Sequence, residues 1–272
     1  MVYYFNFGFV IEQALVELVK NYFDSMQLDD IYDNFHISVV NEHPFAHMII
    51  DHNSRCADNF PSVVITSEMD SKPGELNNLP VQTIGIGLTK EDLINIKNIG
   101  WRNKTKIVNG NEVVVKKNGI IQKEKIPGYV LVYDEPTIEN LIKIADSRNL
   151  DGQVGMIYGL KLVTRRRDRV SIEIWAENNQ LKNEIYEHLR LFLIGVTKEL
   201  LKSIYGVFNP VIFDGSINGN RGANYNFDFD TLLCGSNITF DIDYDISQII
   251  LDTDINNINN NLILEVINHV KK

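Results

Sequence analysis

Residues 165–193, RRRDRVSIEIWAENNQLKNEIYEHLRLFL, contain the change of periodicity that decides the fold. Apolar and polar side chains alternate through residues 170–176, VSIEIWA, as they do in a β-strand with one buried face. After Asn178 the apolar residues recur every three or four positions, which is the spacing of an amphipathic helix. We therefore predict a strand that leads directly into a long helix ending at Gly206.

The arginines at the start of this stretch are predicted to lie at a turn. Residues 156–163, MIYGLKLV, also alternate in polarity, so we predict that they pair with residues 170–176 as a hairpin. Residues 164–169 would form the connection of this hairpin. Its tip would present a positive cluster, which consists of Arg165, Arg166, Arg167 and Arg169.

The other periodic segments predict the fold class. Residues 10–23 have helical spacing, and residues 63–66 form a short β-branched strand. Residues 237–246, NITFDIDYDI, alternate strictly, and residues 255–270 return to helical spacing. Because strands that alternate cleanly have one wet face, we predict an α+β fold with a mostly antiparallel sheet and helices packed on one face.

The wet face of the strand at residues 237–246 carries Asp241, Asp243 and Asp245. Alternate residues of a strand share a face, so these carboxylates could gather a divalent ion if they lined a cleft. More commonly such a stripe is solvated or lies opposite basic residues of a neighbouring strand. We favour this second interpretation and predict no metal site, no cofactor and no catalytic residue.

The domain organisation is predicted to be a core interrupted by a module. The core would comprise residues 1–80 and 151–272, with residues 81–150 inserted between them. Within the insertion, Thr89 and Asp92 have the spacing of a capping box at the start of a helix. A further helix is predicted to open at Pro136.

A basic β-meander is predicted between these two helices. Asn118–Gly119 and an earlier Asn-Gly pair predict type I′ turns. Residues 98–126 hold seven Lys or Arg side chains and two acidic ones. Nucleic-acid binding at residues 102–125 is one alternative for this surface. The net charge of −10 and the absence of aromatic residues interleaved with the basic ones argue against that alternative.

A histidine-rich segment supplies the main alternative function. Four of the six histidines and one of the two cysteines stand within 21 residues. They are His36, His43, His47, His52 and Cys56. Their spacing matches no familiar zinc motif, and Pro44 separates the two histidines that are four apart. A metal-binding domain or metal-dependent enzyme centred on these residues remains the alternative.

Composition predicts a soluble globular chain. The hydrophobic content of 44% over 272 residues is ample for a core, and no stretch approaches the roughly 18 apolar residues of a membrane span. We expect neither a signal peptide nor an anchor, and two cysteines make no disulfide framework, so a reducing cytoplasm is predicted. Neither a P-loop, a dinucleotide glycine pattern nor a Gly-x-Ser-x-Gly elbow is present.

The charge is distributed unevenly along the chain. Residues 1–70 and 206–272 carry net charges of −9 and −6, whereas residues 71–150 and 151–205 carry +3 and +2. Copies arranged around a ring would place the acidic face of one copy against the basic face of the next.

The order of three segments resembles that of tail-terminator and related head-to-tail joining (neck) proteins of tailed bacteriophages. Members of that group have an N-terminal helix, a P-x-V-x-I strand, a hairpin ending in a Trp-Ala-like step, a long helix and a late strand. The matching positions here are Pro61, Val63 and Ile65, then Ile172, Ile174, Trp175 and Ala176, then the helix from Leu181 to Leu201. The resemblance covers about 150 residues, and residues 81–150 have no counterpart in it. This departure leaves three alternatives open: the terminator itself, a neck connector, or a similar sheath-capping protein of a contractile or phage-like particle.

The resemblance implies a non-enzymatic ring, commonly a hexamer, in the tail or neck of a virion. Such a ring would stack on the tail tube, stop its polymerisation and bind a head-side connector, while DNA passes through its channel without specific binding. It would assemble in the cytoplasm of a bacterial host, with no membrane partner. We expect the arginine cluster, together with Asp241, Asp243 and Asp245, to form contacts with neighbouring subunits or with the tube.

Overall fold

A computed structural model of the chain shows two compact units. It describes residues 2–26, 37–41, 60–69, 82–108, 111–133, 135–149, 154–212, 218–226 and 232–253. Unit 1 comprises Met1–Phe9, Asn78–Arg165 and Ile246–Lys272. Unit 2 comprises Val10–Asn77 and Arg166–Asp245. The module predicted at residues 81–150 falls within unit 1, which also includes both ends of the chain.

Two long strands contribute to both units. β12 spans Met156–Ala176 and β15 spans Leu232–Asp252, and each is 21 residues long. The hairpin predicted at residues 156–176 is therefore wrong, because β12 runs straight through the arginines. Residues 164–169, TRRRDR, contain no Gly, Asn or Pro to make a tight turn. Their side chains instead continue the alternation of an extended strand.

In unit 1, the first half of β12 pairs with β4, and β1 lies between β11 and β15. All of these pairs are antiparallel. The strands are β1 (Val2–Phe9), β4 (Gln82–Thr89) and β11 (Tyr129–Val132). β1 was not predicted from the sequence. Its buried residues Phe5, Phe7 and Phe9 alternate with more exposed ones, as in a strand with one buried face.

The two helices of unit 1 begin where the sequence predicts. α4 (Lys90–Asn98) starts with a complete capping box, in which the Asp92 backbone N–H donates to Thr89 Oγ1 and the Thr89 N–H donates to Asp92. The Thr89 hydroxyl also donates to the Asp92 carboxyl, at 2.7 Å, and this hydrogen bond and the one from the Thr89 N–H lower the pKa of that carboxyl. α5 (Glu135–Ser147) buries Ile138, Leu141 and Ala145, which are three of the positions at helical spacing after Pro136.

Six short strands connect α4 to β11. They are β5 (Trp101–Asn103), β6 (Thr105–Val108), β7 (Asn111–Val114), β8 (Lys116–Lys117), β9 (Ile120–Ile121) and β10 (Lys123–Lys125). The predicted turn at Asn118–Gly119 is confirmed, since both residues have positive φ angles, 52° and 80°.

In unit 2, the second half of β12 lies between β3 and β15. β3 also pairs with β2 in a parallel ladder, whereas β13 and β14 pair with β15 in antiparallel ladders. These strands are β2 (Ser38–Val40), β3 (Ser62–Met69), β13 (Phe208–Ile212) and β14 (Asn218–Asn226). β3 and the regular part of β15 confirm the strands predicted at residues 63–66 and 237–246.

The helices of unit 2 are α1 (Ile11–Ser25), α6 (Asn179–Gly195) and α7 (Thr197–Ser203). The prediction of one helix continuing to Gly206 is wrong. The helix breaks at Val196, directly after Gly195, a poor helix former. There the Thr197 hydroxyl donates a hydrogen bond of 3.0 Å to the Phe192 carbonyl.

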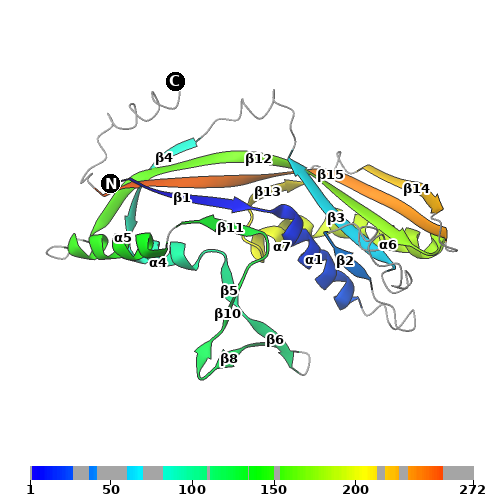
Figure 1. The fold of residues 1–272 in the computed structure, drawn as a ribbon, viewed down its shortest axis with the longest axis horizontal. Coiled ribbons are helices and arrows are strands. Elements are labelled where there is room, and N and C mark those ends of the chain that lie inside the picture. Colours follow the sequence, from blue (N-terminus) through cyan, green and yellow to red (C-terminus); the bar gives the residue numbers. More distant parts are fainter. Residues whose placement is uncertain are drawn as a thin grey trace. The chain divides into compact units, whose positions relative to one another are not determined.

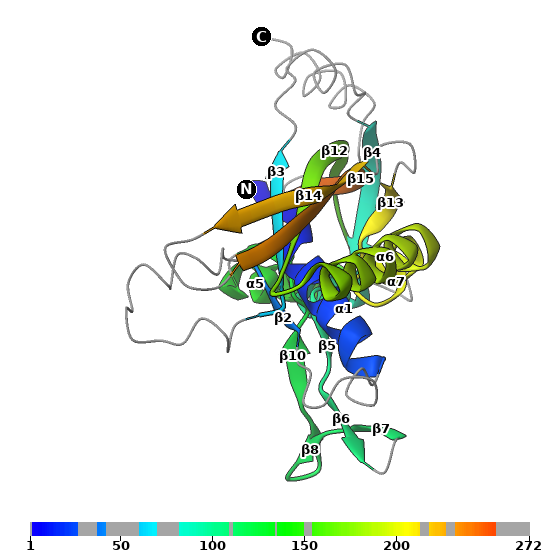
Figure 2. The ribbon, with the colours of Figure 1, turned by 90° about the vertical axis from the view of Figure 1, so that its right-hand side faces the viewer.

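The core of unit 2 lies between these helices and the strands. Figures 1 and 2 show α1, α6 and α7 on the same side of β12 and β15. Ile172, Ile174 and Phe240 are at most 1% exposed on the strands, and the rings of Tyr22 in α1 and Phe192 in α6 stack with centroids 4.1 Å apart. The predicted α+β class, with a mostly antiparallel sheet and helices on one face, is confirmed.

Trp175 at the end of β12 packs directly on the backbone of β15. A Cβ atom added to Gly235 would lie 2.6 Å from the Trp175 ring, so only glycine allows this approach. The predicted helix at residues 255–270 and the cluster from His36 to Cys56 lie outside the described residues.

Candidate interaction surfaces

Arginines of β12 and aspartates of β15 form ion pairs on one face of the sheet in unit 2. Arg167 binds Asp243 with two hydrogen bonds, of 2.7 Å from Nε and 3.1 Å from a terminal nitrogen. Arg169 Nε donates to Asp241 at 3.0 Å. Asp243 is 7% exposed as a residue, whereas the Arg169 and Asp241 side chains are 50% and 21% exposed. Asp241 and Asp243 of the stripe thus lie opposite basic residues of a neighbouring strand, as the second interpretation of the sequence predicts.

The opposite face of β12 holds a buried carboxylate. Asp168 is 1% exposed and accepts two hydrogen bonds, from Arg166 Nε at 2.7 Å and from the Tyr244 hydroxyl at 2.6 Å. The Arg166 guanidinium carbon also lies 5.8 Å from the centre of the Tyr244 ring. Burying an unpaired charge carries a large free-energy cost, so the hydrogen bonds from Arg166 and Tyr244 make the burial of Asp168 possible.

Burial and hydrogen bonding shift the pKa values of Tyr244 and Arg166. Burial raises the pKa of the Tyr244 hydroxyl, and its hydrogen bond to Asp168 raises it further. Burial opposes the charge on Arg166, but the hydrogen bond to Asp168 and the proximity of Tyr244 outweigh it and raise the pKa of the guanidinium. Tyr244 therefore stays neutral and Arg166 stays charged at physiological pH.

The predicted interface residues come together only in part. Arg166, Arg167 and Arg169 each bind an aspartate of their own chain instead of projecting from a turn. Arg165 stands one position earlier in β12 and is half-buried. Asp245 shares a strand face with Asp241 and Asp243, and pairs in register with Phe208 of β13.

Sequence reasoning missed the role of Asp168. Flanked by arginines, it looks like a solvent-exposed residue of a charged turn. The available signal was its position two residues before Val170, because alternate strand residues share a face and Val170 and Ile172 are fully buried.

The six short strands of unit 1 form what we call the three-ribbon module, residues 101–125. β5 pairs with β10, β6 with β7, and β8 with β9. Three backbone hydrogen bonds join the ribbons: Lys104 N–H donates to Gln122 O, Val115 N–H to Lys104 O, and Gln122 N–H to Val115 O, at 2.8, 2.8 and 2.9 Å. Figure 1 shows β5 and β10 leading away from α4 and β11 and branching into the other two ribbons.

The surface of the three-ribbon module is both basic and apolar. It contains seven Lys or Arg and two Glu side chains, a net charge of +5. Ile107 is 79% exposed and Ile120 is 68% exposed, and four further large apolar residues of the module are exposed. A two-stranded ribbon has no core of its own, so this apolar area stays in water in the single chain.

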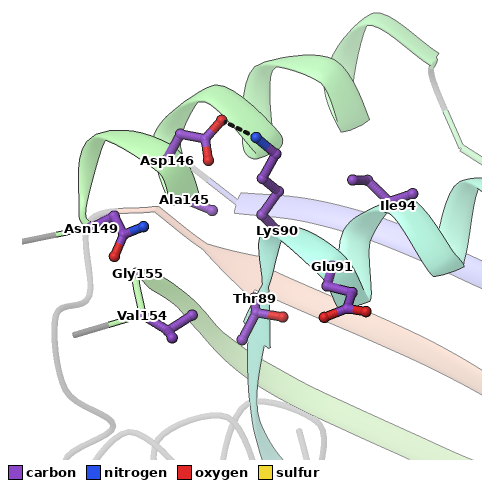
Figure 3. Close-up of a pocket in the computed structure, with 9 residues that line it drawn as sticks. All are labelled: Thr89, Lys90, Glu91, Ile94, Ala145, Asp146, Asn149, Val154 and Gly155. Carbon is purple, nitrogen blue, oxygen red and sulfur yellow. Dashed lines mark hydrogen bonds and ion pairs between the residues drawn. The ribbon is translucent and has the colours of Figure 1, made fainter. Parts of the chain in front are cut away.

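Unit 1 also has a pocket of about 390 Å³ between the start of α4 and the end of α5 (Figure 3). Lys90 and Asp146 on its wall form an ion pair of 2.8 Å between half-exposed side chains. Since that pair already neutralises the lysine, the pocket offers no spare positive charge from Lys90 to an anionic ligand.

The two units differ strongly in charge. Unit 2 contains 24 acidic and 11 basic side chains, a formal net charge of −13. Unit 1 contains 12 acidic and 15 basic side chains, a net charge of +3. The acidic character of the chain therefore resides in unit 2.

Comparisons with known proteins give no relative for the chain: no protein-family model and no curated protein sequence matches it. Within the described ranges, no group of three or more His, Cys, Asp and Glu side chains is placed to hold a metal ion. None of the helices in that part of the chain is both long and apolar enough to span a membrane.

Proposed function

We propose that the chain is a structural, ring-forming protein of the tail or neck of a phage or phage-like particle. In this role its ring, which we take to be a hexamer, stacks on the end of the tail tube, stops the tube from growing and presents a surface to the head-side connector. The chain acts by binding its neighbours and catalyses no reaction.

The observation that carries the proposal is the arrangement of elements in unit 2. α1 precedes β3, which begins after Pro61 and contains Val63 and Ile65. β12 ends in Trp175 and Ala176 directly before α6, and β15 follows and lies beside β12. This is the order that the resemblance implies, with two departures: a continuous β12 replaces the hairpin, and the long helix is divided into α6 and α7.

The ion-paired arginines have a different role in this proposal from the one that a hairpin tip would give them. Because Arg167 and Arg169 hold Asp243 and Asp241, they fix β12 against β15 within one subunit. Subunit contacts then come from surfaces that are exposed in the single chain. The opposite net charges of the two units support a contact in which unit 1 of one copy meets unit 2 of the next.

Electron microscopy of the purified full chain tests this function. The proposal predicts closed rings of uniform size, and shorter tail tubes when the chain is added to growing tube protein from the same genome. Tubes of unchanged length, or a chain that never forms rings, would contradict it.

A further inference from the structure

Two ribbons of the three-ribbon module, β6–β7 and β8–β9, share a pattern of side chains, and we call them the outer ribbons. Each places a lysine directly across from an exposed branched apolar residue. The pairs in register are Lys106 with Val113, Lys116 with Ile121, and Lys117 with Ile120. Residues directly opposite in an antiparallel pair have Cβ atoms about 4.5–5.5 Å apart, so each pair presents one mixed, basic and apolar spot.

This pattern suits a protein surface better than a polyanion. A nucleic acid or an anionic membrane would be attracted by the lysines, but the residues outside the module carry a net charge of −15 and would repel it. The outer ribbons also have no aromatic side chain on which bases could stack. Burying the exposed isoleucines against an apolar surface would stabilise a complex. Carboxylates beside that surface would pair with the lysines.

The outer face of α6 in unit 2 has the complementary pattern. Leu191 and Ile194 are 67% and 50% exposed, although they belong to a helix whose other side is buried. Glu184 and Glu187 precede them in the same helix. The four residues follow one another at spacings of three, four and three, so their side chains lie on one helix face. This face therefore combines two carboxylates with two exposed apolar side chains.

We propose that the outer ribbons of one copy dock on the outer face of α6 of a second copy. This deepens and rests on the proposed function, for which it supplies the contact between subunits. The contact joins different surfaces of the two partners, so repeating it adds copies in one direction and closes a ring if the rotation permits. It also places the module, with its charge of +5, against a unit of charge −13.

Isotope-resolved photo-crosslinking tests the contact in the full chain. A benzophenone amino acid replaces Ile120 in ¹⁵N-labelled protein, which is mixed with unlabelled wild type and irradiated. Trypsin then releases residues 118–123 from the module and residues 183–190 and 191–198 from α6 and its end. We expect crosslinked peptides that pair the labelled module fragment with an unlabelled α6 fragment.

The matched control places the same benzophenone at Ile94, an exposed isoleucine of α4 in unit 1 (40% exposed). It should give no isotope-mixed peptide with α6. Absence of mixed peptides from position 120 would overturn the contact between copies. Mixed peptides confined to other segments would overturn α6 as the partner surface, and crosslinks to co-purifying nucleic acid or lipid alone would overturn the choice of a second copy.

A charge exchange provides a second, independent test. When the labelled chain with benzophenone at position 120 also carries Lys116→Glu/Lys117→Glu, it should no longer crosslink to α6 of the unlabelled wild type. It should crosslink again to α6 of an unlabelled chain that carries Glu184→Lys/Glu187→Lys. Loss without recovery would contradict direct pairing of these surfaces.

The two experiments distinguish failure of the contact from failure of the function. If rings cap tubes but the module does not crosslink to α6, this inference fails and the proposed function stands. If the crosslinks form but tubes grow unchecked, the function fails and the contact stands.

Discussion

The two basic clusters of the chain, the arginines of β12 in unit 2 and the lysines of the three-ribbon module in unit 1, have opposite surroundings. Arg166 and Arg167 each hold an aspartate of the same chain, and those aspartates are at most 7% exposed. The lysines of the outer ribbons are exposed beside exposed isoleucines and valines. The arginine cluster is the denser of the two along the sequence, with four arginines in residues 165–169 against seven Lys or Arg in residues 101–125. Local charge density therefore does not identify a binding surface.

What distinguishes the two clusters is whether a matching strand lies beside them. The aspartates of β15 have the same two-residue spacing as the arginines of β12. Arg167 and Arg169 therefore form ion pairs within the subunit. Within the part of the chain that the structure describes, the strands of each outer ribbon pair only with each other, so no third strand offers carboxylates in register with the lysines. The first cluster should therefore govern stability and the second should govern assembly.

The largest effect is expected from Asp168→Ala. The substitution removes the partner of Arg166 and of the Tyr244 hydroxyl within the core, and breaking a buried pair typically costs about 3–5 kcal/mol. Urea unfolding measures the loss. Asp241→Ala is the control, because its partner Arg169 is half-exposed and such pairs contribute about 0–1 kcal/mol. Equal losses in the two variants would contradict the distinction between the buried and the exposed pair.

Tyr244→Phe should cost less, because it removes one hydrogen bond and leaves the ion pair of Arg166 and Asp168 intact. Hydrogen bonds to charged groups contribute about 1.5–3 kcal/mol. Thermal unfolding of the variant measures the difference. A free energy of unfolding equal to that of the wild type would show that the Tyr244 hydroxyl contributes nothing to holding β12 and β15.

Alkaline pH should weaken the fold through the same tyrosine. The pKa of Tyr244 is raised above its unfolded value of 10.0, and burial raises the pKa of Tyr129 to about 12. The neutral forms therefore stabilise the fold fully below pH 10, and this contribution declines as pH rises above 10. Each tyrosine accounts for up to about 1.4 kcal/mol per pH unit in that range. Unfolding curves from pH 9 to 12 should show a shallower decline for Tyr244→Phe than for the wild type.

Gly119→Ala tests whether the three-ribbon module unfolds independently of β12. Gly119 has a φ of +80° in open space, so alanine meets no neighbour but adopts a left-handed conformation that costs about 1–2 kcal/mol. Because each ribbon is only two strands wide and is held by its own ladder, hydrogen exchange should increase in residues 111–125 and stay unchanged in β12. Faster exchange in β12 would show that the two regions unfold together.

The smallest effect on stability is expected from reversing the lysines. Lys106, Lys116 and Lys117 are exposed, and each substitution to Glu should change the free energy of unfolding by less than about 0.5 kcal/mol. Circular dichroism during thermal unfolding measures it. A large loss of stability would mean that the module contributes to the fold of the single chain.

Several elements were predictable because one local rule decided them. The capping box of Thr89 and Asp92, the turn at Asn118–Gly119 and the switch from β12 to α6 at Asn178 each follow from neighbouring residues. The straight course of β12 was not predictable in this way. A run of charged residues between two alternating segments looks like the connection of a hairpin, although residues 164–169 contain no Gly, Asn or Pro. Their pairing with carboxylates of β15, more than 70 residues away in sequence, accounts for their extended course.

The candidate surfaces were predictable to a similar, limited degree. The sequence locates both basic clusters and the stripe of Asp241, Asp243 and Asp245, but it does not show which cluster is neutralised. That depends on register between distant strands, which no local periodicity encodes. The exposure of Leu191 and Ile194 was equally hidden, because a helix pattern with extra apolar residues reads simply as a wider buried face.

Sedimentation equilibrium of three proteins tests the central claim most directly. They are the wild type, the triple variant Lys106→Glu/Lys116→Glu/Lys117→Glu, and a control, Lys143→Glu/Lys198→Glu/Lys202→Glu, which makes the same change of net charge at exposed lysines outside the module. We predict a closed oligomer for the wild type and the control, and a folded monomer for the module variant. A module variant with the mass of the wild-type oligomer would contradict the assignment of assembly to the three-ribbon module.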